Sequence, residues 1–140
     1  MLDFFLVAFA PQPIATASLD AWRWRRRVLV VCAEERYPPA KGPAATQLQF
    51  IDHEGYAERD VALVYVADDD RFYIDYASKD AGAFGNEDRL SEICADDDFR
   101  VALIGKDGDV KASFQSPVAA EALFDIIDAM PMRRPAMRRR

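Results

Sequence analysis

The segment that most constrains the fold of this chain is residues 99–134, which has the pattern of a β-hairpin followed by a helix. Two apolar runs, 100–104 and 110–114, flank the sequence Lys-Asp-Gly-Asp. Because Asp and Gly tolerate positive φ, Asp-Gly between apolar runs predicts a hairpin with a type I′ turn. Such a unit forms half of several α/β folds, so it indicates a shape rather than a reaction.

The helix after the hairpin is predicted to run from Ser116 to Met130. Ser116 can cap the first turn with its hydroxyl, and Pro117 has the φ that a first turn requires. Pro131 is expected to end the helix. Apolar residues at a period of 3.6 predict a core-facing stripe of Val118, Ala122, Leu123, Ile126, Ile127 and Met130.

Two nearly continuous apolar runs, 27–33 and 60–67, predict central strands that are buried on both faces of a parallel sheet. Residues 44–54 between them predict a helix that ends at Gly55. The three elements form a βαβ unit, which requires parallel strands and a right-handed crossover. Residues 71–76 alternate weakly and predict a short edge strand.

A further helix is expected after Asn86, which can act as its N-cap. Leu90, Ile93 and Cys94 share its apolar face. The predicted order of elements is β-α-β-(β)-α-β-β-α. It indicates an α/β fold of thioredoxin-like topology, with a mixed four- to five-stranded sheet and helices on both faces.

The charge of the chain is unevenly distributed. Of 18 basic residues, five arginines lie in the last eight positions, so the rest of the chain has 13 basic and 24 acidic residues, a net charge of −11. Such an acidic body repels phosphate backbones and argues against nucleic-acid binding. Residues 135–140 are expected to form a solvated basic tail rather than a contact with an anionic surface.

The N-terminus bears on the compartment. Residues 4–10 are apolar, and residues 15–17 have the small-x-small form of a signal-peptidase site, but no basic residue precedes them. The run is too short to span a bilayer. A degenerate signal peptide over 1–18 is favoured over a flexible arm, and residues 19–134 are expected to form one domain. The protein is therefore predicted to be periplasmic or secreted, with the cytoplasm as the alternative.

Three patches of the chain resemble a family of thioredoxin-like, peroxiredoxin-related domains of unknown function: 24–31, Trp-Arg-Arg-Arg-Val-Leu-Val-Val; 105–108, Gly-Lys-Asp-Gly; and 127–134, Ile-Asp-Ala-Met-Pro-Met-Arg-Arg. Such domains occur as small exported bacterial proteins and at the C-terminus of sushi-repeat-containing extracellular proteins. The resemblance covers residues 19–134. It implies a thioredoxin-like fold and export, and it implies no established activity.

The sequence departs from thioredoxins at the site of their chemistry. Residues 33–39, Ala-Glu-Glu-Arg-Tyr-Pro-Pro, stand where thioredoxins have Ala-Glu-Trp-Cys-Gly-Pro-Cys. Arg36 and Pro39 replace the two cysteines, and neither can supply the thiolate or the resolving thiol. The sequence therefore predicts a non-catalytic binding or accessory domain without a cofactor, and an enzyme is disfavoured.

The candidate binding residues follow the first central strand. Glu34, Glu35, Arg36 and Tyr37 lie where ligands of open α/β sheets bind, beyond the carboxyl end of a strand. Arg100 is expected nearby. A site for a protein partner or a small ligand and a structural ion pair that caps the loop both fit this pattern.

The alternative function depends on Cys32 and Cys94. Their positions on a strand and on a facing helix could form a relocated redox pair, in a thiol-dependent oxidoreductase or peroxidase. Two free thiols buried in the core are the favoured interpretation, because free cysteine is commonly buried. A third alternative is a structural subunit that forms a homodimer through the last helix or an edge strand.

The remaining candidates have structural interpretations. His53, the single histidine, is expected on a solvent-facing helix surface, and no metal site is predicted. The aspartate triplets 68–70 and 96–98 lack the spacing of a calcium loop and are expected to be solvated. Trp22 and Trp24 are expected to pack over the sheet edge.

Overall fold

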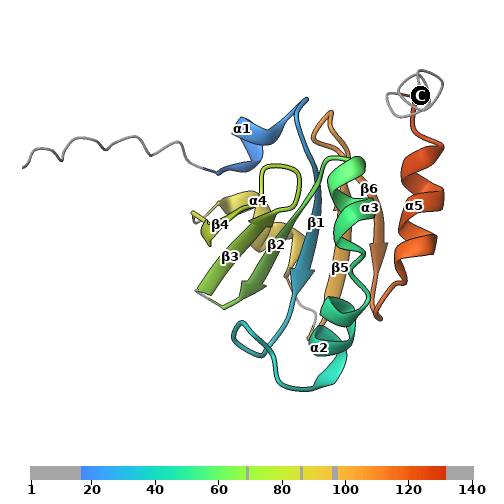
Figure 1. Cartoon of the computed structure of the whole chain (residues 1–140). Coiled ribbons are helices and arrows are strands. Elements are labelled where there is room, and N and C mark those ends of the chain that lie inside the picture. The colour runs from blue at the N-terminus through green and yellow to red at the C-terminus, as the bar shows by residue number, and fades with distance from the viewer. Residues whose placement is uncertain (1–16, 69, 86, 96–97, 132–140) are drawn as a thin grey trace, which may run out of the picture.

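Six strands form one mixed sheet, in the order β4-β3-β2-β1-β5-β6 (Figure 1). The computed structural model describes residues 17–68, 70–85, 87–95 and 98–131. The strands are β1 (Arg27–Cys32), β2 (Val61–Ala67), β3 (Asp70–Asp75), β4 (Asp80–Ala83), β5 (Arg100–Ile104) and β6 (Val110–Phe114). The helices are α1 (Leu19–Trp22), α2 (Gly42–Gln49), α3 (His53–Glu58), α4 (Asp88–Ile93) and α5 (Ala120–Asp128).

The centre of the sheet agrees with the sequence. β1 and β2 pair in parallel, with Leu29 opposite Leu63, and every residue of both strands is buried. β5 pairs antiparallel with β1 on its other side. The continuous apolar runs are explained by this burial, because both faces of the central strands are covered.

Helices cover both faces of the sheet (Figure 1). On one face, Ala44 of α2, Tyr56 of α3 and Leu123 of α5 join a core that includes Leu29 and Leu63. On the other face, Leu19, Trp22 and Leu90 from α1 and α4 pack on alternate residues of the same strands. The sheet is therefore the middle of three layers.

The sheet has six strands rather than the four or five expected. β3 is not an edge strand, because β4 pairs with it antiparallel, with Tyr73 opposite Gly82. Tyr73 also donates its hydroxyl hydrogen to Asp80 at 2.7 Å. The sequence Asp-Ala-Gly-Ala of β4 has neither β-branched residues nor alternation, so no local signal marks it as a strand.

The predicted hairpin forms between β5 and β6, but its turn is not type I′. Within the turn only Gly108 has positive φ, at 91°, and its N–H donates to the carbonyl of Gly105 at 2.9 Å. The register shifts between Leu103 and Ile104. A turn followed by a left-handed glycine and a bulge needs one residue with positive φ, so Asp107 stays in the ordinary region.

The last helix begins at Ala120, four residues after the predicted start. The buried side chain of Gln47 explains the delay. Its Nε2 donates to the carbonyl of Val118 at 3.1 Å, and its Oε1 accepts from the N–H of Val118 at 2.7 Å. Both backbone groups of Val118 are thereby used outside a helix. Pro131 does lie beyond the end of α5, which has Ala129 as its C-cap.

The single helix predicted over 44–54 is two helices, and Gly55 lies inside the second rather than at the end of the first. Asp52 interrupts the run, because its Oδ1 accepts from the N–H of Gly55 at 3.0 Å and caps α3. A Cβ on Gly55 would lie 2.5 Å from the ring of Phe124 in α5. This glycine therefore allows the close contact of the two helices.

Several expectations fall at the ends and loops of the chain. Trp22 is buried as expected, but Trp24 is 60% exposed. The residue before α4 that acts as N-cap is Glu87, and Asn86 lies outside the described residues. The same holds for residues 1–16 of the predicted signal peptide and for the basic tail. Among the described residues, no helix has the length and hydropathy needed to cross a membrane.

Candidate functional site

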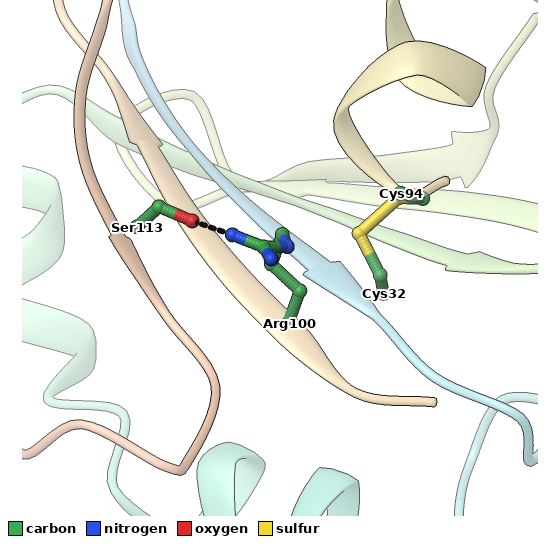
Figure 2. The surroundings of a disulfide bond; sticks show 4 residues. All are labelled: Cys32, Cys94, Arg100 and Ser113. Carbon is green, nitrogen blue, oxygen red and sulfur yellow. Dashed lines mark hydrogen bonds between the residues drawn. A yellow bond between two sulfur atoms is a disulfide. The ribbon is translucent and has the colours of Figure 1, made fainter. Parts of the chain in front are cut away.

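A disulfide joins Cys32 at the carboxyl end of β1 to Cys94, the C-cap residue of α4 (Figure 2). The two Cα atoms are 5.5 Å apart and 62 residues apart in sequence. The prediction of two free thiols is therefore wrong. The signal was present in the sequence, because Cys94 shares the apolar face of Leu90 and this face packs on the side of the sheet that carries Cys32.

The disulfide lies at the wall of a cavity of about 420 Å³. Cys32 is only 3% exposed, while Cys94 is half-buried. The residues that line the cavity are Cys32, Ala33, Glu34, Val66, Asp68, Arg71, Leu90, Ser91 and Cys94. A small solute can therefore approach the sulfur atoms from the carboxyl end of the sheet.

Carboxylates dominate the electrostatics of this end. The pKa of Glu34 is raised, first by the charge of Asp98 and then by burial, with smaller contributions from Glu35, a hydrogen bond to Asp98, and Asp68. These groups come from the ends of β1 and β2 and from the residue pair before β5. Cys94 lies at the carboxyl end of α4, which is the negative end of the helix dipole. Both features destabilise a thiolate here.

Arg36 has a different partner from the one expected. Its Nε lies 2.6 Å from Oδ2 of Asp70, at the start of β3, rather than opposite Glu34 or Glu35. The side chains are 84% and 51% exposed. An ion pair this open contributes little to stability, so it does not fix the loop.

The loop after β1 is held by aromatic contacts. The ring of Tyr37 stacks on Phe72 with centroids 4.4 Å apart and contacts Tyr65 edge-on at 5.4 Å. Tyr65 donates its hydroxyl hydrogen to the carbonyl of Glu35 at 2.6 Å. Burial, and then the nearby Glu35, raise the pKa of Tyr65 to about 12. Tyr37 and Glu35 thus anchor the loop from which Glu34 and Arg36 project.

Arg100 does not join this group. It lies opposite Cys32 in the ladder, but its guanidinium donates to the hydroxyl of Ser113 in β6 (Figure 2). Of the five predicted binding residues, Glu34 alone lines the cavity at the disulfide. Sequence reasoning missed Asp68, Arg71 and Ser91, because nothing local shows that three separate segments meet there.

No group of three or more His, Cys, Asp or Glu side chains in the described part of the chain could hold a metal ion. His53 is exposed, and its ring lies 5.2 Å from that of Tyr76. Of the two aspartate triplets, Asp69, Asp96 and Asp97 lie outside the described residues.

The fold and the site define an α/β domain with a mixed sheet, in which a disulfide ties a helix to the central strand. The chain belongs to a family described as a domain of unknown function (DUF4174), whose model matches residues 18–135. No curated protein and no solved structure matches the chain. The family description names no activity, so the chemistry has to be inferred from the site.

Proposed function

We propose that this protein is an exported, non-catalytic domain of thioredoxin-like type, which acts as a binding or accessory module. The order β2-β1-β5-β6 supports the thioredoxin-like relation, with β1 parallel to β2 and the other pairs antiparallel. A βαβ unit followed by ββα supplies these four strands. β3 and β4 extend this core at the edge beside β2.

The observation that carries the non-catalytic assignment is the environment of the disulfide. Reactive cysteines lie at helix N-termini or beside cations, which stabilise the thiolate. Cys94 instead caps the carboxyl end of α4, and Glu34, Asp68 and Asp98 gather on the same side. The disulfide therefore acts as a cross-link, and the attack of a thiolate on another disulfide is disfavoured.

Export is supported by the same bond. Disulfides persist in the periplasm and outside cells, and they are rare in the cytosol. A periplasmic or secreted location agrees with the apolar run and the small-x-small sequence near the N-terminus.

The binding role belongs to the loop after β1 and the cavity beside it. Glu34 projects from the loop into the cavity wall, and Arg36 is almost fully exposed. The ring of Tyr37 packs against Tyr65 and Phe72 and anchors this loop to the sheet. A protein partner or a small ligand would be recognised here by its polar groups.

A disulfide-exchange assay tests the proposal against the redox alternative. That alternative has one observation in its favour, since Cys32 and Cys94 both line the cavity. We expect the oxidised protein to leave the dithiothreitol-driven reduction of insulin unchanged, as does the Cys94→Ala variant. Maleimide labelling after mild reduction should be slow in the native state and fast in urea. Acceleration of insulin reduction that is lost in Cys94→Ala would overturn the proposal.

A further inference from the structure

The end of the sheet opposite the disulfide carries unusual apolar exposure. Of the described residues, three large hydrophobic side chains are exposed: Trp24 at 60%, Val110 at 44% and Phe50 at 40%. Trp24 and Val110 both lie at the end where β1 begins and the β5–β6 hairpin turns (Figure 1). A hydrogen bond joins the backbone of Trp24 to the β5–β6 turn, because its N–H donates to the carbonyl of Lys106 at 2.6 Å.

A cavity of about 510 Å³ lies between Trp24 and the end of α5. Its walls are mainly apolar and include Ile126, Met130 and Pro131. This volume is in the range of ligand-binding cavities. We call the cavity and Trp24 together the Trp24 surface. No residue of the Trp24 surface belongs to the site at the disulfide.

Basic side chains surround the Trp24 surface. Lys106 and Lys111 line it with one carboxylate, Asp107, and Arg27 also lines it but is buried. Lys106 and Lys111 pair with Asp60 and Asp107 at 2.8 and 2.7 Å, at the rim of the cavity.

Further arginines adjoin the surface. Arg23 and Arg25 are exposed on either side of Trp24. Five arginines follow Pro131 within the last nine residues of the chain. Among the described residues, Arg23, Arg25, Lys106 and Lys111 thus form a local group of basic side chains at this end of an acidic protein.

We propose that the Trp24 surface docks on an anionic lipid bilayer. Tryptophan prefers the boundary between headgroups and acyl chains, because its ring is apolar and its N–H is polar. Clusters of Lys and Arg add attraction to anionic headgroups, and together the two contributions give reversible peripheral binding.

Two features distinguish this surface from a nucleic-acid site: its walls are aliphatic, and the rest of the protein is acidic. Single strands bind to aromatic stacking platforms in basic grooves. Here Ile126, Met130 and Pro131 form the wall, and Trp24 is the single aromatic residue that lines the cavity. Acyl chains and the glycerol region of a lipid fit such a wall better than bases do.

Vesicle co-sedimentation tests the proposal with the oxidised, full-length protein. We expect binding to vesicles of about 30% phosphatidylglycerol in phosphatidylcholine, none to pure phosphatidylcholine, and release in about 0.5 M NaCl. Trp24→Ala and Lys111→Glu should each lower the partition coefficient about tenfold. Phe50→Ala is the control, because it removes another large exposed aromatic side chain, outside the Trp24 surface, and it should bind like wild type.

Three outcomes would overturn the proposal. One is equal binding to both kinds of vesicle, or to neither. The second is wild-type partition of Trp24→Ala and Lys111→Glu. The third is an absence of vesicle binding together with another occupant of the Trp24 surface. That occupant would be a fluorescent single-stranded oligonucleotide that binds tightly, or a second copy of the chain, seen as a dimer in size-exclusion chromatography that Trp24→Ala abolishes. Cys94→Ala leaves the Trp24 surface intact, so this variant should partition onto vesicles like wild type. The vesicle test therefore does not depend on the outcome of the disulfide-exchange assay.

Discussion

The pKa of Glu34, at the carboxyl end of β1, depends on the charges around it. Its carboxylate faces Asp98, Glu35 and Asp68, and its pKa is raised above the ordinary value near 4.5. The protonated form is therefore favoured in the folded state relative to the unfolded chain. Between the two pKa values the folded state binds more protons, so the stability contribution of Glu34 falls as pH rises through this window.

We predict that Glu34→Gln raises the melting temperature at about pH 7 and leaves it unchanged near pH 3.5, where the glutamate is protonated in both states. The measurement is thermal unfolding of both proteins at a series of pH values. Glu121→Gln, an exposed change in the first turn of α5, serves as the control and should not raise the melting temperature at neutral pH, because it removes a favourable charge from the N-terminus of a helix. A lower melting temperature for Glu34→Gln at neutral pH would show that Glu34 makes a favourable contact instead.

The residues of the site were only partly predictable from the sequence. The loop Glu34–Tyr37 could be placed beyond the strand end, because a continuous apolar run marks β1 so clearly. The partner of Arg36 could not, because Asp70 belongs to a strand whose pairing has no local signal. The sequence favours two free thiols over a bonded pair, since burial alone does not distinguish a free thiol from a bonded one.

At the scale of elements, the contact of α3 with α5 depends on Gly55. We predict that Gly55→Ala destabilises the protein by about 2 kcal/mol, because the new methyl group would overlap the ring of Phe124. Urea unfolding followed by circular dichroism measures the change. Gly85→Ala is the matched control, since a Cβ there meets nothing within 4 Å. Equal stability of the two variants would mean that Phe124 rotates away without cost.

Specific side-chain contacts also limit how well the helix boundaries could be predicted from the sequence. Periodicity located α5 and the region of α2 and α3, but the break between α2 and α3 depends on the cap of Asp52, and the start of α5 depends on a contact distant in sequence. Gln47, 71 residues away, forms hydrogen bonds with both backbone groups of Val118. The hydroxyl and proline before α5 therefore suggested a start that tertiary hydrogen bonds override.

For the whole molecule, the disulfide closes a loop of 62 residues around β2, β3 and β4. We predict that the Cys32→Ala/Cys94→Ala variant loses about 4 kcal/mol of unfolding free energy, which is the chain-entropy estimate for a loop of this length. Urea denaturation of the oxidised and double-variant proteins measures it. A loss below about 1 kcal/mol would argue that the bond does not serve as a stabilising cross-link.

The overall topology was predictable where burial is continuous and turns have strong signals. β1, β2, β5 and β6 follow from apolar runs and from Asp-Gly, and the parallel pairing of β1 with β2 follows from the rule for βαβ units. β4 is short and has no β-branched residue, and it depends on pairing with β3 rather than on its own sequence.

The two ends of the central strand β1 carry different kinds of surface. Trp24 precedes β1 and Cys32 is its last residue, and the six residues of this strand span roughly 20 Å. A protein resting on a bilayer through Trp24 would stand upright, with the axis of β1 along the membrane normal. The carboxylates of Glu34, Asp68 and Asp98 at the other end of β1 would then face the aqueous space, where a soluble protein could bind them without contact with the lipid.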